Sequence, residues 1–144
     1  MFKKILIILL LLIPLTACQT VPKADANKTN TQLGLQYLLG RGVPQDNQKA
    51  FTYFSLAAKE DDAFAQNELA YMYAAGKGTP QNYEKAIAYY QKAADRGLAS
   101  AQYNLGLMYE YGLGTEPNLE LAQSWYQKAA DHGFTPAKKK LKML

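Results

Sequence analysis

A repeat with a fixed period of 36 residues runs through most of this chain. Residues 66–73 align with residues 102–109, and residues 86–95 align with residues 122–131, each pair at the same offset. A more divergent copy lies upstream and keeps the same frame at Leu33, Tyr37, Gly40, Gly42, Ala50, Phe54, Ala57 and Ala58. A period of roughly 20 to 50 residues is typical of stacked repeats, in which each unit buries its apolar face against its neighbours. The repeat therefore constrains the fold more than any local motif.

Each copy reads as a pair of helices, because its apolar residues recur at helical spacing and do not alternate as in a strand. In the second copy a first helix is expected at about residues 63–75, with Leu69, Ala70 and Tyr73 on one face. Gly76 and Pro80 end it, since glycine closes a helix in the left-handed conformation and proline cannot continue one. Asn82 is expected to cap a second helix that ends at Gly97 and buries Ala86, Tyr89, Tyr90, Ala93 and Ala94.

The last ten residues, 135–144, are expected to form a basic capping helix. Thr135 is the expected N-cap and Pro136 the first helical residue, where a missing N–H group costs nothing. The apolar side consists of Ala137, Leu141 and Leu144, and the other side of Lys138, Lys139, Lys140 and Lys142. A terminal repeat needs such a helix, apolar on one side and soluble on the other. The alternative, that the lysines bind anionic lipid or a partner, stays open.

The predicted fold is therefore an all-α, α/α superhelix that stacks three helix-pair repeats and ends in the capping helix. The repeats occupy residues 31–137, divided at about 31–64, 65–100 and 101–136.

The first 17 residues have the features of a secretory signal. Lys3 and Lys4 precede an apolar run at residues 5–13, which is too short to span a bilayer. The segment Leu15-Thr16-Ala17-Cys18 resembles the bacterial lipobox, which implies diacylation of the Cys18 thiol, cleavage between Ala17 and Cys18, and acylation of the new amine. An ordinary cleavable signal is the alternative.

By resemblance to Gram-negative lipoproteins, Gln19 after the cysteine favours the outer membrane, facing the periplasm. Residues 18–30 read as a lipidated N-terminus followed by a flexible linker, because they are small or polar and have no helical period. A disordered linker of this length spans roughly 20 Å.

Composition argues against several kinds of site. The formal net charge is +4, and without Lys3 and Lys4 it falls to +2, from 14 basic and 12 acidic residues. Most of that excess lies in the C-terminal lysines, so the charge is weak evidence for nucleic-acid binding.

A single cysteine excludes an intramolecular disulfide and a cysteine metal cluster. No metal-ligand spacing and no catalytic constellation are present, and His132 is expected to interact with the last carbonyl groups of a helix. We expect no enzyme activity, no metal and no cofactor.

The repeat resembles a known family. Residues 105–114 read Leu-Gly-x-x-Tyr-x-x-Gly-x-Gly, and residues 122–133 read Ala-x-x-Trp-Tyr-x-Lys-Ala-Ala-Asp-x-Gly. These motifs are similar to the Sel1-like repeat, a relative of the tetratricopeptide repeat, and residues 69–97 hold a near-full copy. The first copy departs from it, with Tyr53-Phe54 in place of Trp-Tyr and Asp61 in place of the closing glycine. The resemblance implies a right-handed superhelix and a non-catalytic adaptor that holds other proteins, often in the bacterial envelope.

In the tetratricopeptide relatives, the first helix of each pair lines a partner-binding groove. Carried onto this chain, that register implies a groove formed by Leu35, Leu38, Asn67, Tyr71, Ala74, Tyr103, Leu107, Glu110 and Tyr111, closed by Lys139 and Met143. Asn67 is expected to be exposed. For Tyr71 and Tyr103, packing against the next repeat is an equal alternative.

The function expected from these features is a membrane-anchored lipoprotein that holds another envelope protein or peptide in its repeat groove. One alternative is an immunity protein that neutralises a periplasm-targeting toxin or hydrolase, since some Sel1-like lipoproteins resemble such immunity proteins. A third possibility is binding or hydrolysis of β-lactams. It is less favoured, because the Sel1-like proteins with that activity carry a disulfide in each repeat.

Overall fold

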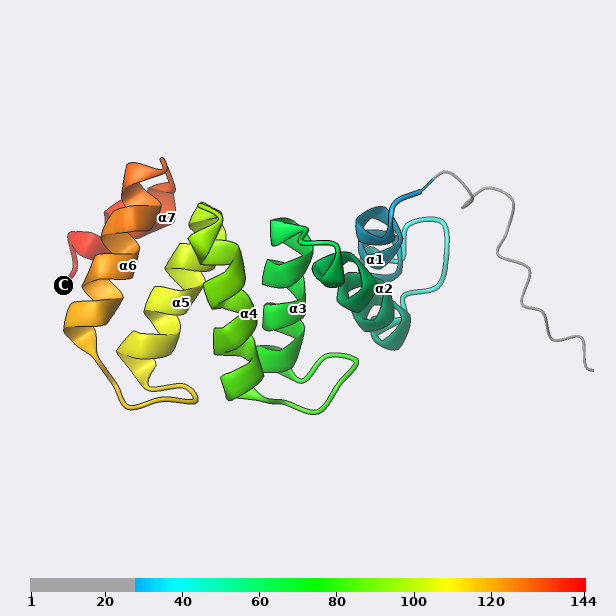
Figure 1. The fold of residues 1–144 in the computed structure, drawn as a ribbon, viewed down its shortest axis with the longest axis horizontal. Coiled ribbons are helices and arrows are strands. Elements are labelled where there is room, and N and C mark those ends of the chain that lie inside the picture. The colour runs from blue at the N-terminus through cyan, green and yellow to red at the C-terminus, as the bar shows by residue number, and fades with distance from the viewer. Residues whose placement is uncertain (1–27) are drawn as a thin grey trace, which may run out of the picture.

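The computed structural model describes residues 28–144, and within them it contains seven helices and no strand. Figure 1 shows the helices as an elongated row that runs from α1 at one end to α7 at the other. Their bounds are α1 Asn30–Leu39, α2 Asn47–Lys59, α3 Ala63–Ala75, α4 Tyr83–Asp95, α5 Ala99–Tyr111, α6 Leu119–Asp131 and α7 Thr135–Leu141. The predicted α/α superhelix of three helix pairs and a capping helix is confirmed. Expectations for residues 1–27, including those for Ala17 and Cys18, lie outside the described residues.

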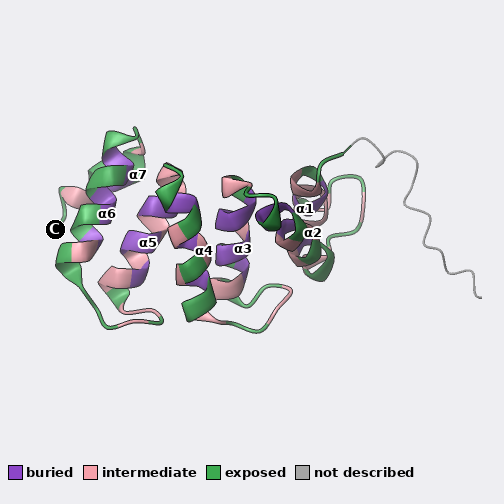
Figure 2. Ribbon diagram, in the orientation of Figure 1, coloured by how far each residue is buried: buried purple, intermediate pink, exposed green. Residues whose placement is uncertain are grey.

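Contacts between helices follow the order of the chain. The strongest contacts all join consecutive helices, from α1 with α2 through to α6 with α7. Buried residues lie where neighbouring helices face each other, and exposed residues cover the outer surfaces and loops (Figure 2). This arrangement is that of a solenoid, in which each repeat is stabilised by its neighbours.

The predicted ends of the second helix pair agree with the structure. Helix α3 spans Ala63–Ala75 and ends at Gly76, which has a φ of 65°. The side chain of Asn82 caps α4 by accepting a hydrogen bond from the backbone N–H of Lys85.

At both ends of the described chain, helix boundaries differ from those predicted. Thr29 caps α1 through a capping box with Gln32, so Thr29 and Asn30, expected in the linker, cap and begin the first helix. At the other end Thr135 lies inside α7, and the N-cap is Phe134, whose carbonyl accepts hydrogen bonds from the N–H groups of Ala137 and Lys138. The side chain of Phe134 packs against Tyr103, with ring centroids 5.3 Å apart, so tertiary packing fixes where this helix begins.

The second glycine of each Gly-x-Gly turn allows one repeat to approach the repeat before it. A Cβ atom on Gly78 would lie 2.2 Å from the carbonyl oxygen of Asn47, at the start of α2. One on Gly114 would lie 2.6 Å from the Cβ of Tyr83, at the start of α4. Gly42, which has no described repeat before it, has nothing within 4 Å. The glycine spacing therefore serves the stacking of repeats.

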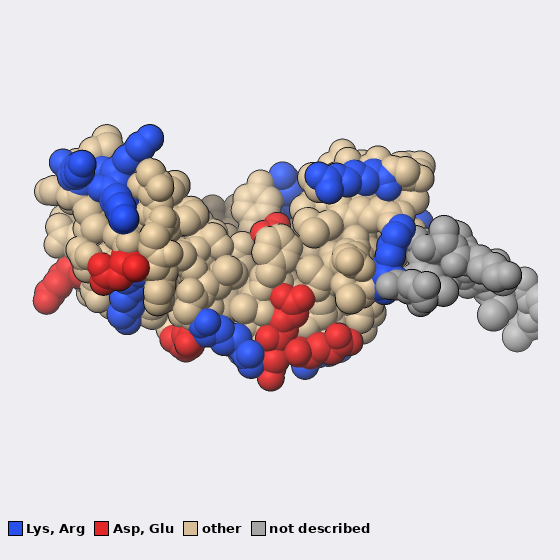
Figure 3. Space-filling view, turned by 90° about the horizontal axis from the view of Figure 1, so that it is seen from above, with Lys and Arg blue, Asp and Glu red and all other residues tan. Residues whose placement is uncertain are grey.

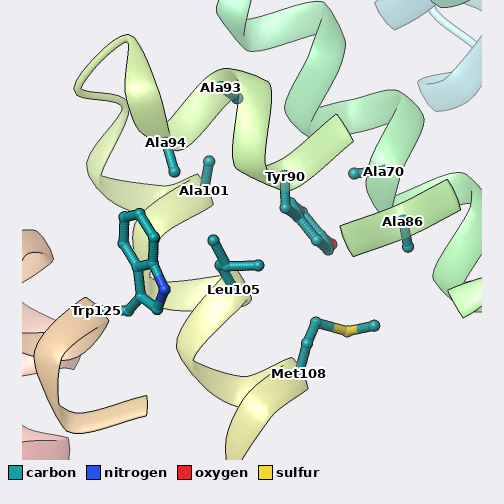
Figure 4. Packing of buried hydrophobic residues seen from close by; sticks show 9 residues of the cluster. All are labelled: Ala70, Ala86, Tyr90, Ala93, Ala94, Ala101, Leu105, Met108 and Trp125. Carbon is teal, nitrogen blue, oxygen red and sulfur yellow. The ribbon is translucent and has the colours of Figure 1, made fainter. Parts of the chain in front are cut away.

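The core is continuous across the helix pairs. Figure 4 shows one cluster to which four helices contribute, with Tyr90 and Leu105 among alanines and Trp125 at one side. Leu69 and Leu105 are almost fully buried, and Tyr73 and Tyr109 pack against the core as half-buried residues. The predicted inward face is confirmed. Tyr89, expected to be buried, is half-buried and stacks on Tyr73 with ring centroids 5.8 Å apart.

Candidate functional site

The residues expected to form the groove lie on the first helices of the three repeats, α1, α3 and α5. We call this the first-helix surface and define it by Leu35, Asn67, Glu68, Tyr71, Tyr103, Leu107, Glu110 and Tyr111. The described residues of α1, α3 and α5 include two charged side chains, Glu68 and Glu110.

Two tyrosines give this surface its exposed aromatic area. Tyr71 is 40% exposed and Tyr111 is 60% exposed, although both are large and partly apolar. The ammonium group of Lys77 donates a 2.9 Å hydrogen bond to the Tyr71 hydroxyl. Of the two alternatives for Tyr71, exposure is therefore the one that the structure adopts. Leu35 and Leu107 are half-buried on α1 and α5.

Tyr103 follows the other alternative and packs against the next helices. Its ring lies 5.4 Å from that of Tyr126 and 5.3 Å from that of Phe134, measured between centroids. It is half-buried and belongs to the cluster that holds the capping helix. Its main role in this structure is packing within the last repeat and against the start of the capping helix.

The expected exposure of Asn67 is wrong, since only 6% of this residue is exposed. Its Nδ2 donates to Oε1 of Glu68 at 3.0 Å, and its Oδ1 accepts from Nδ2 of Asn104 at 3.2 Å. A buried amide requires hydrogen-bond partners, and the neighbouring repeat supplies one of them. Asn67 thus links α3 to α5 and positions the carboxylate of Glu68.

Glu68, which is not among the predicted groove residues, is a half-buried carboxyl group on α3, three residues before Tyr71. Burial raises its pKa above the ordinary value, and the hydrogen bond from Asn67 lowers it only in part. The hydroxyl of Tyr90 also has a raised pKa, mainly through burial and secondarily through the charge of Glu68. A signal for Glu68 was present in the sequence, because it is the one charged residue in α3.

Glu110 is also half-buried, but its charge is neutralised within the chain. The ammonium group of Lys140 on α7 lies 2.7 Å from Oε1, and the hydroxyl of Tyr126 on α6 donates to Oε2. Burial alone would raise the pKa of Glu110, but these two hydrogen bonds and the charge of Lys140 bring it below the ordinary value. Glu110 therefore holds three helices together.

Lys139 and Met143, which were expected to close the groove, are exposed.

His132 has a different partner from the one expected. Its Nδ1 lies 2.8 Å from Oε1 of the buried Gln102, whose Nε2 donates to the carbonyl oxygen of Ala94. The side chain of His132 thus connects the end of α6 to α5.

Residues 28–144 contain neither a cluster of metal ligands nor a membrane-spanning helix. No group of three or more histidine, cysteine or acidic side chains is arranged there to hold a metal ion. Among the same residues, none of the helices has the length and apolar character needed to cross a bilayer.

Comparison with known proteins identifies the repeat. The Sel1 repeat family model matches residues 30–62, 63–98 and 99–134. The chain belongs to the Sel1 repeat family. The matched units begin close to the starts of α1, α3 and α5, so each unit of this Sel1 repeat protein is one helix pair. Proteins of this family are typically scaffolds for protein–protein interaction.

Solved structures of Sel1 repeat proteins have the same fold. A Sel1 repeat protein from Oxalobacter formigenes is 32% identical with a TM-score of 0.74, over 79% of this chain and 45% of that one. A protective antigen of uropathogenic Escherichia coli strains, with an SLR fold, is 30% identical with a TM-score of 0.75, over 78% of this chain and 24% of that one. Cysteine rich protein B of Helicobacter pylori is 28% identical with a TM-score of 0.66, over 78% and 84%.

The present Sel1 repeat protein thus spans less than half the length of the first two of these relatives. No curated protein matches it.

Proposed function

We propose that this protein is a lipoprotein of the bacterial envelope that acts as a non-catalytic scaffold, holding an envelope protein or peptide on its first-helix surface. The observation that carries the proposal is the exposure of Tyr71 and Tyr111 on that surface. Aromatic side chains, tyrosine among them, are enriched where proteins bind one another, because they offer a large contact area and a hydroxyl group at small entropic cost. Neither a nucleic acid nor a metal ion is required.

The lipid anchor is proposed from Leu15-Thr16-Ala17-Cys18, and the location at the outer membrane, facing the periplasm, is proposed from Gln19 after the cysteine. Three acyl chains exceed the two signals that stable anchoring needs. Replacing Cys18 by alanine is expected to move the protein from the membrane pellet to the soluble fraction of its host. Retention of the Cys18→Ala variant in the pellet would contradict the anchor.

The scaffold role can be tested by crosslinking in the native envelope, followed by affinity capture of the tagged protein. Tyr71→Ala and Tyr111→Ala are expected to reduce recovery of the partner, because each removes exposed aromatic area. Leu56→Ala is a matched control, since Leu56 is 41% exposed on the second helix of a repeat and Tyr71 is 40% exposed on a first helix. The proposal fails if no protein is recovered under several growth conditions, or if the three variants behave alike.

A further inference from the structure

Two glutamates on the first-helix surface are both half-buried but differ in how their charge is balanced. Glu110 has Lys140 within 2.7 Å and the hydroxyl of Tyr126 as a second donor. Glu68 accepts a hydrogen bond from the neutral amide of Asn67. No ion pair joins Glu68 to a lysine or arginine within the part of the chain that the structure describes. Glu68 is therefore the one charge on α1, α3 and α5 that the described chain leaves unneutralised.

A half-buried carboxylate without a cation is unfavourable for the folded protein. It has lost part of its hydration, and the one hydrogen bond from Asn67 compensates only partly, as the raised pKa of Glu68 indicates. Glutamine at this position would keep the hydrogen bond and remove the desolvated charge. The presence of a charge that destabilises the free protein is explained if that charge serves to bind a partner.

The surroundings of Glu68 fit the side chain of a basic residue. Tyr71 lies three residues further along the same helix and is therefore on the same side as Glu68. The ammonium group of Lys77 already lies 4.9 Å from the centroid of the Tyr71 ring, and Tyr71 nevertheless stays 40% exposed. That exposed area can cover the aliphatic stem of a lysine or arginine whose charged end reaches the carboxylate. Asn67 donates a hydrogen bond to the Glu68 carboxylate and is itself held by a hydrogen bond from Asn104.

The lysines that contact residues of the first-helix surface, Lys77 and Lys140, are bonded to groups other than Glu68. Lys77 is bonded to the Tyr71 hydroxyl, and the lysines of α7 are gathered at the C-terminal end of the molecule (Figure 3). The interaction of Lys140 with Glu110 is a model for such recognition within the same chain. There a lysine from a helix packed beside α5 neutralises a half-buried glutamate of the first-helix surface.

We propose that Glu68 binds a lysine or arginine side chain of the partner protein, in the way that Glu110 binds Lys140, with Tyr71 packed on the stem of that residue. This inference rests on the proposed scaffold function and adds the chemistry of the partner, a segment with a basic residue flanked by apolar ones. The apolar neighbours contact Leu35 and Leu107, which lie on the first helices of the preceding and following repeats.

The test is a selection of random peptides, displayed on phage, against the full-length protein in detergent micelles. The wild-type protein and Glu116→Gln are expected to enrich peptides that contain lysine or arginine next to apolar residues. Glu116 is an exposed loop residue, so its substitution makes the same change in charge away from the first-helix surface. Glu68→Gln is expected to lose the enrichment in basic residues.

A selected peptide then measures the contact directly by calorimetry. Glu68→Gln is expected to weaken its binding about tenfold, and replacing the basic residue of the peptide by methionine is expected to weaken it by a similar factor. Combining both changes should cost little more than either change alone. Because Glu68→Gln removes an unpaired half-buried charge, it should unfold at the same temperature as the wild type or a higher one, which separates lost binding from lost folding.

The outcomes distinguish this inference from the function on which it rests. Peptides that bind without lysine or arginine, or that bind Glu68→Gln as tightly as the wild type, overturn the role of Glu68 and leave the scaffold function standing. If no peptide binds any of the proteins, both proposals are contradicted. Self-association of the wild type that disappears in Glu68→Gln makes the occupant a second copy of this chain and overturns the proposed partner.

Discussion

At the scale of single residues, the most informative departure from the repeat is Asp61. The second and third repeats close with Gly97 and Gly133, which have φ angles of 83° and 84°. Asp61 occupies the same place and has a φ of 62°, a left-handed conformation that costs energy for any residue with a Cβ. Its ion pair with Arg96, at 2.9 Å, is between side chains that are 71% and 45% exposed and contributes little.

Replacing Asp61 by glycine is therefore expected to raise the free energy of unfolding by up to about 1 kcal/mol. The gain comes from relief of backbone strain and exceeds the small loss of the ion pair. Urea denaturation of the full-length protein measures it. Gly97→Asp is the opposite change in the next repeat and should lower stability. A stable Gly97→Asp or a destabilised Asp61→Gly would contradict this account.

At the scale of helix pairs, a small residue on the first helix faces a large ring on the second. The pairs are Gly34 with Phe54, Ala70 with Tyr90 and Gly106 with Tyr126. A Cβ atom on Gly106 would lie 2.5 Å from Cε1 of Tyr126, and one on Gly34 would lie 2.7 Å from Cε1 of Phe54. Glycine weakens a helix interior by roughly 1 kcal/mol relative to alanine. Its presence in α1 and α5 is explained by the close approach of these rings.

Gly106→Ala is expected to lower the free energy of unfolding by about 1 kcal/mol. Overpacking against the buried ring of Tyr126 costs roughly 1–3 kcal/mol, and the better helix propensity of alanine returns about 1 kcal/mol. Chemical denaturation measures the change. Ser124→Ala, at an exposed position of α6, serves as a control that should alter stability by less than about 0.5 kcal/mol. An unchanged or increased stability of Gly106→Ala would show that the ring moves aside at no cost.

At the scale of the whole molecule, each repeat is stabilised by contacts with its neighbours. A repeat at the end of the row has a neighbouring repeat on one side only, so its stability depends on the element that covers its other side. Helix α7 is short, and it covers Ala129 and Ala130 through Ala137 and Leu141. Lys140 adds a polar connection, because its partner Glu110 is also bonded to Tyr126. One ion pair thus joins α7 to both helices of the last repeat.

Lys140→Met is expected to destabilise the C-terminal repeat by about 1–3 kcal/mol, because it leaves Glu110 half-buried without its cation. Hydrogen exchange should become faster in α7 and at the end of α5. Lys139→Met, at an exposed position of the same helix, is the control and should change exchange little.

The effect of Lys140→Met should also depend on pH. The folded protein holds the pKa of Glu110 below its ordinary value of 4.5, so the ion pair contributes its full stability above that pH. Its contribution is lost as the pH falls through the lowered pKa. The difference in stability between the wild type and Lys140→Met should therefore shrink in acid, and a difference that grows below pH 4.5 would contradict the assigned pair.

The candidate site could be predicted from the sequence only in part. Repeat register placed Leu35, Tyr71, Leu107 and Tyr111 on the first helices, because side chains three or four residues apart share a helical face. It could not determine that Asn67 is buried, that Tyr103 packs against Tyr126, or that Glu110 is paired with Lys140. Each of these depends on a residue at least 20 positions away that the stacking brings into contact. Glu68 was missed although it is the one charged residue of α3, because only the folded structure reveals that its charge has no cationic partner among the described residues.

The sequence by itself determined the helix pairs, their order and their inward faces. Those features depend on local signals that recur every 36 residues, such as the apolar spacing and the caps at Gly76 and Asn82. Tertiary structure alone decided which polar side chains of neighbouring repeats satisfy one another and which charge remains unbalanced. The physical reason is that burial and pairing are properties of the interface between repeats, where residues 30 or more positions apart, such as Glu110 and Lys140, come within hydrogen-bond distance.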